Sequence, residues 1–382
     1  MRGLKLTILL LSMLTMMAAA IIAPSLPDIA REFSNLPDVE LLSKLILSLP
    51  ALMIAIFAPF VGRYIDRFGR LKLLYIGLIG YAISGTSGYF SSDLYFILLG
   101  RMLLGVSISI IMTIAATLIG DFFEGKARQR FIGYQTAFIG MAGVIFLIMG
   151  GLLATVHWRM PFLIYLVSLI MIPLGSSYLK ESKPIIIPSN NELTSPKLLK
   201  ILFLVGTLFM ILFYLMPTQL PFLLKSIGIN DPSYAGYSLA VNALGIVCSS
   251  LSYGWIKQQF SFLSVAWLSL MMMGGGYFLT GYSATFGSIL ASVFLAGLGL
   301  GLFIANLNFW ILELSPALVR GKNMGILTAC LFFGQFSSPI VAEPIIRYSD
   351  LASLFVSALL VIGFMGITLT VTTFLTDKEA QY

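Results

Sequence analysis

The stretch Gly62–Lys72 reads GRYIDRFGRLK, and it is the densest polar cluster in a chain that is otherwise strongly apolar. It holds four basic residues and one acid between two apolar runs, Leu41–Val61 and Leu71–Phe90. Each run is long enough to cross a bilayer, which takes about 20 apolar residues. We therefore expect the cluster to form a short, tight turn at a membrane surface, and its positive charge favours the cytoplasmic surface.

Composition places the whole chain among membrane proteins. Hydrophobic residues make up 58% and charged residues 10% of the 382 residues, and the mean hydropathy is +0.97, whereas soluble domains have about 25% charged residues. Because lipid offers the backbone no hydrogen-bond partner, only helical bundles and closed barrels span a membrane. The apolar runs here are unbroken over about 20 residues, whereas barrel strands alternate over about 10. The sequence therefore predicts an all-α membrane protein.

Hydropathy predicts twelve spans, at residues 5–26, 41–61, 71–91, 94–119, 131–154, 161–179, 199–223, 233–254, 262–282, 285–312, 323–345 and 351–375. The longest interruption, rich in Pro, Asn and Ser, follows span six and indicates a linker. We expect an N-terminal six-helix bundle at residues 1–180, a linker at 181–198 and a C-terminal six-helix bundle at 199–382. The segment Asp121–Arg130 after span four is echoed by Glu313–Lys322 after span ten, which indicates a duplicated unit.

The basic residues are distributed unevenly over the expected loops. The side that holds both termini and the linker has 17 Lys and Arg residues, and the opposite side has 4. Because loops rich in Lys and Arg stay in the cytoplasm, we expect both termini to be cytoplasmic. Two more basic residues, Lys44 and Arg101, fall inside spans. The net charge of +7 is thus an orientation signal, and no nucleic acid partner is expected.

Residue types that carry enzymatic or metal chemistry are scarce. His157 is the only histidine, and Cys248 and Cys330 lie inside apolar runs, which argues against a disulfide framework or a metal-binding spacing. The Gly runs at residues 274–276 and 297–301 lack the GKS/T sequence of a nucleotide loop and favour close helix packing. We expect no enzyme, no cofactor and no metal site, since a membrane enzyme would need clustered His, Asp or Glu near one surface.

Two motifs resemble those of a known family. The turn GRYIDRFGR (Gly62–Arg70) resembles the signature loop between helices two and three of the major facilitator superfamily, and WRMPF (Trp158–Phe162) looks like that superfamily too. The resemblance covers the whole chain at the level of twelve helices and a central linker, and the chain looks most like bacterial twelve-helix drug/proton antiporters. It implies two pseudo-symmetric six-helix bundles in a bacterial cytoplasmic (inner) membrane.

The resemblance also implies a conformational latch. In the family, the acid of the signature loop packs against the cytoplasmic start of helix eleven, here near residues 323–325, when the inner side is closed. A carboxylate at a helix N-terminus gains about 0.3 to 1 kcal/mol, which shifts the populations of two states that differ by a few kcal/mol. The alternative is that these charges only anchor and orient the loop. The expected latch residues are Gly62, Asp66, Arg67, Gly69 and Arg70.

Three ionisable residues are candidates for proton coupling. Arg101 and Gly105 match the superfamily's fourth-helix motif, whose Arg is linked to proton coupling, and an Arg this deep in a span needs a water-filled interior or a partner. The alternative is that Arg101 snorkels to the outer surface. Glu343 lies late in span eleven, and an embedded carboxyl group can exchange protons near neutrality; its alternative is a solvated helix end. Asp28 is a proton site or an interfacial residue.

The chain departs from the antiporters at two places. Span one, MLTMMAAAIIAP, holds no acid, although related antiporters usually carry an embedded carboxylate there. In span five, Gly133–Gly151 aligns with the antiporter motif of the fifth helix, but Phe146 and Leu147 replace the family's Gly-Pro pair, while Gly150 and Gly151 remain. These departures leave the direction of transport open.

Polar and aromatic residues that interrupt the apolar spans outline a substrate cavity. Such side chains are costly to expose to lipid, so we expect them to face the interior, although some make interhelical hydrogen bonds instead. Pro217 and Pro221 predict a break in span seven. The cavity candidates are Tyr134, Gln135, Tyr214, Gln219, Asn242, Asn306, Asn308 and Gln335.

These observations predict proton-coupled export of small amphiphilic organic compounds, of the multidrug efflux type, by alternating access. A dedicated exporter of an endogenous metabolite, such as a siderophore or metallophore, is the first alternative, and the missing acid in span one favours it. A proton-coupled nutrient importer is the second, and a membrane enzyme or a sensor would be a different class. The expected partners are a small-molecule substrate, the proton and the lipid bilayer, and we expect a monomer.

Overall fold

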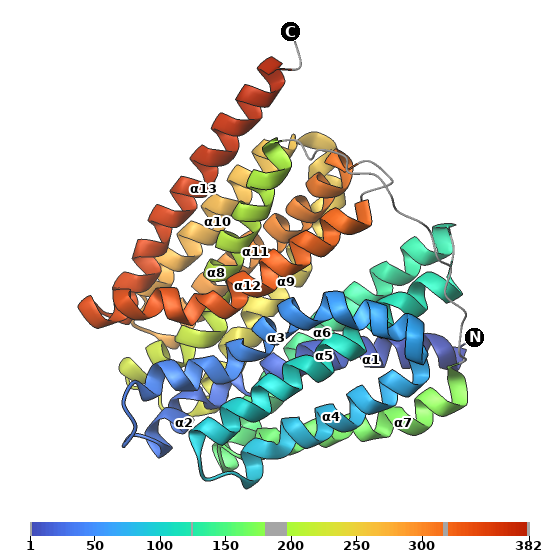
Figure 1. The fold of residues 1–382 in the computed structure, drawn as a ribbon. Coiled ribbons are helices and arrows are strands. Elements are labelled where there is room, and N and C mark those ends of the chain that lie inside the picture. Colours follow the sequence, from blue (N-terminus) through green and yellow to red (C-terminus); the bar gives the residue numbers. More distant parts are fainter. Residues whose placement is uncertain (1, 124, 180–196, 316–319, 380–382) are drawn as a thin grey trace. The chain divides into compact units, whose positions relative to one another are not determined.

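The computed structural model describes residues 2–123, 125–179, 197–315 and 320–379, and in these ranges it contains helices and no strand (Figure 1). Twelve helices there are long and apolar enough to cross a membrane, which confirms the predicted all-α chain with twelve spans. The elements are α1 (Arg2–Ala20), η1 (Ala23–Ser25), α2 (Leu26–Glu32), α3 (Val39–Phe68), α4 (Arg70–Phe90), α5 (Leu94–Phe122), α6 (Gly125–Val156), η2 (Met160–Leu166), α7 (Val167–Tyr178), α8 (Lys197–Ser226), α9 (Pro232–Gln259), α10 (Phe262–Gly281), α11 (Phe286–Leu314), α12 (Arg320–Tyr348) and α13 (Leu351–Glu379).

The helices form two compact units. Unit 1 comprises Met1–Ile186 and Leu220–Tyr237, and unit 2 comprises Ile187–Gln219 and Ser238–Tyr382. The last turns of α8 and the start of α9 therefore belong to unit 1. Most of the expected linker, at residues 181–198, lies outside the described residues, and the expected domain boundaries stay a prediction.

Prolines accompany a break in span one, and they leave span seven intact. Between α1 and α2 the chain passes through η1, and Pro24 and Pro27 stand in the first turns of η1 and α2, where a missing N–H breaks no hydrogen bond. The predicted break at Pro217 and Pro221 is wrong, because α8 is helical without interruption from Lys197 to Ser226. Membrane helices tolerate proline where neighbouring groups satisfy the freed backbone.

The basic cluster at Gly62–Lys72 spans the end of one helix and the start of the next. Helix α3 continues to Phe68, α4 begins at Arg70, and Gly69 alone joins them with φ of 83°. Only glycine takes this backbone conformation without strain. The connection is thus shorter than the predicted turn. The expected latch residues Gly62, Asp66 and Arg67 lie on the last turns of α3, and their side chains lie outside the described part of the structure.

The two units repeat an internal contact, as a duplicated fold should. In unit 1 the Tyr81 hydroxyl on α4 donates to the Leu14 carbonyl oxygen on α1 at 2.7 Å. In unit 2 the Tyr277 hydroxyl on α10 donates to the Leu212 carbonyl oxygen on α8 at 2.6 Å. In both units the third span is therefore tied to the first through a buried tyrosine.

Glycines allow close helix approach at equivalent places in both units. A Cβ on Gly105 of α5 would lie 2.5 Å from the Pro50 carbonyl oxygen of α3. A Cβ on Gly297 of α11 would overlap the Asn242 carbonyl oxygen of α9. The prediction that the glycines of residues 297–301 serve helix packing is confirmed at this contact.

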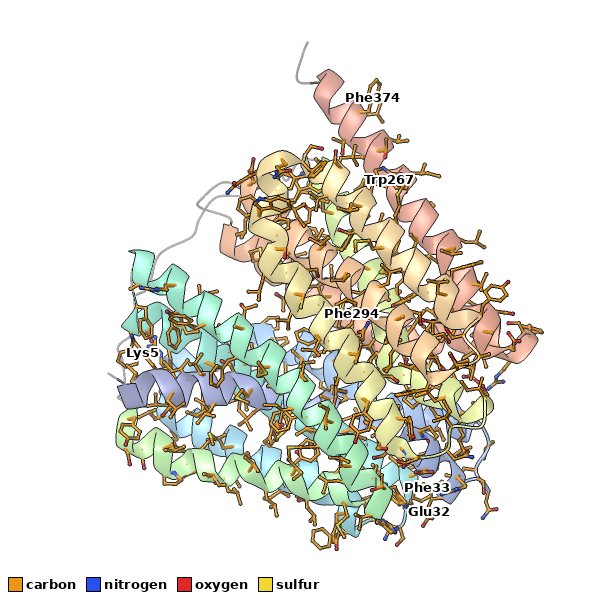
Figure 2. The ribbon with its side chains drawn as sticks, turned by 180° about the vertical axis from the view of Figure 1, so that it is seen from behind. Lys5, Glu32, Phe33, Trp267, Phe294 and Phe374 are labelled. Carbon is orange, nitrogen blue, oxygen red and sulfur yellow. The ribbon has the colours of Figure 1, made fainter. Side chains whose placement is uncertain are left out.

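Unit 1 has two distinct ends. Figure 2 shows Lys5, at the start of α1, at one end, and Glu32 and Phe33, at the end of α2, at the other. We call these the Lys5 end and the α2 end. The Lys5 Nζ lies 5.9 Å from the centroid of the Phe123 ring, just after α5. The Phe33 ring packs edge-on against Trp158 at 5.9 Å between centroids.

Replacing Gly105 with Ala should destabilise the protein, because the new methyl group meets the backbone of α3. Overpacking of this kind costs about 1 to 3 kcal/mol in the free energy of unfolding. Gly133→Ala on α6 is the matched control, since a Cβ there meets nothing within 4 Å. Thermal unfolding of the purified proteins in detergent measures both. Equal melting temperatures for the two variants would contradict the close contact.

Candidate functional site

Arg101 lies on α5 in unit 1 with its side chain fully buried. Its Nη1 donates to the Tyr165 hydroxyl at 2.8 Å, and its Nη2 donates to the Gly85 carbonyl oxygen at 3.1 Å. The guanidinium carbon also lies 4.7 Å from the centroid of the Phe162 ring, within cation–π distance. The Tyr165 hydroxyl in turn donates to the Ala18 carbonyl oxygen at 2.7 Å. Arg101 therefore ties α5 to α4, η2 and α1.

This arrangement solvates a buried cation with neutral groups. A charge enclosed in a low-dielectric interior is costly unless hydrogen bonds and polarisable groups surround it. Two acceptors and two aromatic rings do so here, so Arg101 does not snorkel to a surface. Sequence reasoning did not find Tyr165 as the partner, because the contact joins residues 64 positions apart. A role of Arg101 in proton coupling stays a prediction.

The two acidic coupling candidates each pair with an arginine of their own helix. Asp28 Oδ1 lies 3.2 Å from Arg31 on α2, and Glu343 Oε1 lies 3.1 Å from Arg347 on α12. The side chains of Asp28 and Glu343 are 16% and 14% exposed. Both carboxylates thus lie near helix ends beside a neutralising cation, and their coupling role stays a prediction.

Lys44 on α3 is a second enclosed cation in unit 1, and no site prediction included it. Its side chain is fully buried, and its Nζ lies 3.8 Å from Glu40 Oε2. It also lies 4.9 Å from the centroid of the Phe222 ring on α8. The signal was present in the sequence, because a lysine inside an apolar run is as unusual as Arg101.

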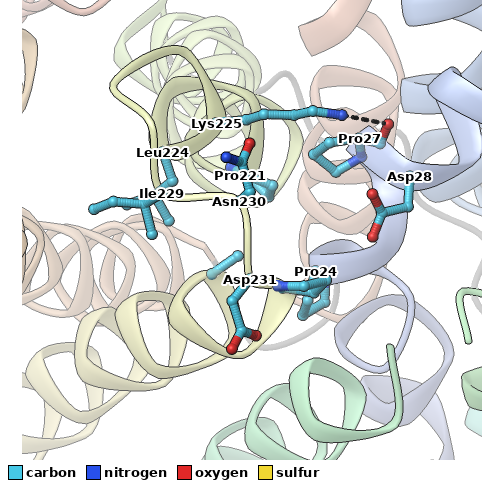
Figure 3. A pocket seen from close by; sticks show the side chains of 11 residues that line it. Pro24, Pro27, Asp28, Pro221, Leu224, Lys225, Ile229, Asn230 and Asp231 are labelled. Atoms are coloured by element: carbon cyan, nitrogen blue, oxygen red, sulfur yellow. Dashed lines mark hydrogen bonds between the residues drawn. The ribbon is translucent and has the colours of Figure 1, made fainter. Parts of the chain in front are cut away.

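The segment Leu220–Tyr237 lies beside η1 and α2 at the α2 end of unit 1. Figure 3 shows Lys225 reaching Pro27, whose carbonyl oxygen accepts a hydrogen bond from the Lys225 Nζ at 3.3 Å. The pocket beside this contact, lined among others by Asp28 and Asp231, has a volume of about 10 Å³. That is room for about one water molecule.

The glycines retained from the antiporter motif pack α6 at this same end. A Cβ on Gly150 would overlap the Ile21 carbonyl oxygen, and a Cβ on Gly151 would lie 3.1 Å from the Gly236 Cα of α9. A Cβ on Gly236 would lie 2.6 Å from the Leu147 carbonyl oxygen. The backbones of α6 and α9 therefore touch with no side chain between them.

Arg70 lies at the Lys5 end as the first residue of α4. Its guanidinium forms an ion pair with Asp121 at the end of α5, and the two side chains are 5% and 15% exposed. One expected latch residue thus links two helices of unit 1. The expected latch, in which the acid of the signature loop packs against the start of helix eleven, stays a prediction.

Four of the cavity candidates make hydrogen bonds. Asn242 donates to the Val293 carbonyl oxygen at 2.8 Å, and Asn306 donates to the Phe262 carbonyl oxygen at 2.9 Å. Both join helices of unit 2. Gln135 donates to the Ser12 hydroxyl at 2.7 Å and joins α6 to α1 in unit 1. Asn308 donates to the Ile304 carbonyl oxygen at 2.7 Å within its own helix.

The other four candidates differ in exposure. Gln219 is fully buried, and its amide has no hydrogen-bond partner in the described ranges. Tyr214 is 4% exposed, Gln335 is half-buried and Tyr134 is 51% exposed. A shared substrate cavity for all eight stays a prediction. The described residues contain no group of three or more His, Cys, Asp or Glu that could hold a metal ion.

The sequence matches one family profile, and its similar curated sequences include tetracycline resistance proteins and multidrug resistance proteins. The profile of the Major Facilitator Superfamily matches residues 8–339. Tetracycline resistance protein, class B, of Escherichia coli is 34% identical over 156 residues, which cover 41% of this chain and 39% of the relative. Multidrug resistance protein 1 of Bacillus subtilis (strain 168) is 32% identical over 142 residues, which cover 37% and 36%. The chain thus spans less than half the length of these curated relatives.

Solved structures share the fold along nearly the whole chain. The nucleoside transporter NupG has a TM-score of 0.81 at 11% identity, with 96% of this chain and 99% of that chain covered. A bacterial homologue of the human lysosomal transporter Spinster has a TM-score of 0.76 at 14% identity, with 98% and 96% covered. At such identities the likeness concerns the fold alone.

Replacing Tyr165 with Phe should destabilise the protein while preserving the ring that faces Arg101. The change removes the acceptor of one charged hydrogen bond and the donor of another, which costs about 1 to 3 kcal/mol of unfolding free energy. Thermal unfolding in detergent measures the loss. Tyr95→Phe, at a 55% exposed position of α5, is the control and should match the wild type. A fully stable Tyr165→Phe variant would rule out the proposed solvation of Arg101.

Proposed function

The chain belongs to the major facilitator superfamily, and on that premise we propose that it exports small amphiphilic organic compounds in exchange for protons by alternating access. The match of the family profile over residues 8–339 is the observation that carries the proposal. Similarity to tetracycline and multidrug resistance proteins favours export and drug-like substrates.

The membrane orientation is part of the proposal. We place the Lys5 end, both termini and the linker on the cytoplasmic side of a bacterial cytoplasmic membrane. The 17 to 4 distribution of Lys and Arg supports this orientation. The α2 end then faces the outside. The boundaries at residues 1–180, 181–198 and 199–382 and a monomeric state belong to the same proposal.

The contacts at the α2 end support an alternating cycle. The segment Leu220–Tyr237 is held there by the hydrogen bond from Lys225 to Pro27 and by the contact between Gly151 and Gly236. A single net hydrogen bond is worth about 0.5 to 3 kcal/mol. Such a closure is strong enough to exclude solvent and weak enough to open when another state gains a few kcal/mol.

The inner latch would act at the opposite end. Asp66 lies on the last turns of α3, Gly69 supplies the sharp turn, and Arg70 is paired with Asp121. We propose that Asp66 stabilises the inward-closed state at the start of α12. Arg101, Glu343 and Asp28 are the proposed coupling groups, and the eight polar residues named above remain the proposed cavity lining.

A dedicated exporter of one acidic or zwitterionic metabolite, such as a siderophore or metallophore, is the second candidate function. The charge pattern favours it, because Lys44 and Arg101 of unit 1 both have fully buried side chains. The acids at Asp28 and Glu343 lie beside arginines of their own helices.

Transport in liposomes tests the proposal. Purified protein should move ethidium, tetracycline or an anionic chelator only under an imposed pH gradient, and a protonophore should abolish the movement. Movement of the chelator alone would select the dedicated exporter. Movement that is independent of the proton gradient would overturn proton coupling, and the absence of any movement of these solutes would overturn drug export.

Replacing Asp66 with Asn should leave membrane insertion intact and remove most of the transport. The amide keeps the size of the side chain but loses the charge that a helix N-terminus stabilises. Gradient-driven uptake at matched protein level measures the effect. Glu32→Gln, at a half-exposed acid at the end of α2, is the control for loss of one negative charge. Unchanged transport by Asp66→Asn would dispose of the latch.

A further inference from the structure

A second pocket at the α2 end of unit 1 is large enough for a ligand. Its volume is about 540 Å³, within the range of about 300 to 1,000 Å³ that is typical of ligand sites. It is formed by the end of α2, the connection from α4 to α5 and the connection from α6 to η2. Its charged lining residues are Glu32, Asp93 and Arg159, and Phe33 and Tyr95 add aromatic rings.

Aromatic packing holds the Arg159 side chain of this pocket in place. The guanidinium carbon lies 4.7 Å from the centroid of the Trp158 ring, and the Phe33 ring packs edge-on against the same indole. The Arg159 backbone N–H donates to His157 Nδ1 at 3.1 Å. The chain before η2 thus presents an ordered guanidinium, which lowers the entropy cost of binding an anion there.

The Arg159 guanidinium has hydrogen-bond donors to spare. Its Nη2 lies 3.9 Å from Glu32 Oε1, which is beyond hydrogen-bond distance. Its Nε–H is enclosed and has no acceptor among the described residues. The guanidinium of Arg101, by contrast, donates to Tyr165 and Gly85. Since a buried donor without an acceptor is costly, Arg159 favours an anion with several oxygens, and a phosphate matches its planar fork.

A carboxylate in the same pocket also has an unused oxygen. Asp93 is the N-cap of α5, where its Oδ1 accepts the Tyr95 backbone N–H at 2.8 Å. Its Oδ2 accepts no hydrogen bond from the residues that the structure describes. The lining charges have a net negative sum, because the carboxylates of Glu32 and Asp93 accompany one guanidinium. A matching ligand therefore brings a cation as well as an anion.

An apolar stripe on α5 begins in this pocket. Tyr95 lines the pocket, and Leu99 and Leu103 follow at intervals of one turn on the same face of the helix. These side chains are 55%, 50% and 55% exposed. Because α5 is long and apolar enough to span a membrane, its start lies at the membrane surface and the stripe continues into the hydrocarbon. A polar pocket thus leads directly into a face that acyl chains can cover.

We propose that the pocket and this stripe bind a zwitterionic membrane phospholipid whose headgroup joins a phosphodiester to a primary ammonium group. The phosphodiester accepts hydrogen bonds from Arg159, and the ammonium donates to Asp93. One acyl chain packs along Leu99 and Leu103.

Other ligands with a phosphate match the pocket less well. A soluble phosphate compound would leave the stripe on α5 uncovered. An anionic phospholipid would bring a second negative charge to a pocket that is already negative. A quaternary ammonium headgroup has no N–H to donate to Asp93. The combination of charges, donors and apolar surface therefore selects the primary ammonium lipid.

Native mass spectrometry of the purified full-length protein tests the site by titration with single lipids in detergent. The wild type should bind phosphatidylethanolamine about tenfold more tightly than phosphatidylglycerol or phosphatidylcholine. Arg159→Met should weaken phosphatidylethanolamine binding about tenfold, and Arg159→Lys should recover part of it, since an ammonium keeps the charge without the planar fork. Equal binding of this lipid by the wild type and Arg159→Met would overturn the site.

Asp93→Asn tests the ammonium contact separately. Asparagine keeps a side-chain oxygen that can cap α5, so the helix start is preserved. Loss of the negative charge should reduce the preference for phosphatidylethanolamine over phosphatidylglycerol to about twofold or less. A preference equal to that of the wild type would contradict the role of Asp93.

Arg31→Met is the matched control, because Arg31 is a 73% exposed arginine on α2 that does not line the pocket. It should bind all three lipids like the wild type. A loss as large as that of Arg159→Met would show that any arginine at this end attracts lipid, and would overturn the site.

Competition by a soluble headgroup separates a lipid site from a phosphate site. Glycerophosphoethanolamine in large excess should fail to displace the bound lipid, because it has no acyl chain to cover the stripe. Displacement would overturn the lipid assignment in favour of a soluble ligand. This measurement uses the wild type alone, so it decides the question even if Arg159→Met fails to fold. It also needs no proton gradient, so its outcome is independent of the proposed transport function.

Discussion

The cost of enclosing a charge in a low-dielectric interior governs the structure of unit 1. Arg101 meets this cost with two neutral acceptors, Tyr165 and Gly85, and with the faces of aromatic rings. Each of these partners comes from a helix other than α5. Solvation of one guanidinium therefore fixes the mutual positions of α4, α5 and η2, and the Tyr165 hydroxyl extends the contact to α1. The residues that solvate the buried charge are therefore also the residues that hold these helices together.

The two units share a plan and differ in charge. Both tie their third span to their first through a buried tyrosine, and both use a glycine to bring two helix backbones together. Unit 1 adds the enclosed cations Lys44 and Arg101. In unit 2, the neutral amides of Asn242 and Asn306 donate hydrogen bonds from one helix to another.

Hydropathy predicted the spans well because the bilayer imposes a local requirement that any 20-residue window reveals. The partners of the embedded residues could not be predicted in this way. Tyr165 and Arg101 are 64 residues apart, and Lys225 and Pro27 are 198 residues apart. The break expected at Pro217 and Pro221 was wrong, because α8 continues through both prolines. The local tendency of proline to break a helix does not decide the outcome where neighbouring groups satisfy the freed backbone. Lys44 was readable in the sequence, but its burial needed the structure.

Alternating access requires the α2 end to open and close as the protein transports its substrate. Pulsed electron resonance between spin labels on Asn35→Cys, after α2, and Asn230→Cys, between α8 and α9, measures this most directly, because both native residues are exposed. Cys248 and Cys330, which are free thiols, would be replaced by serine. If the α2 end alternates between a closed and an open state, the purified protein will show two distance populations whose proportions change with pH and with added substrate. A single distance that stays the same under all these conditions would contradict it.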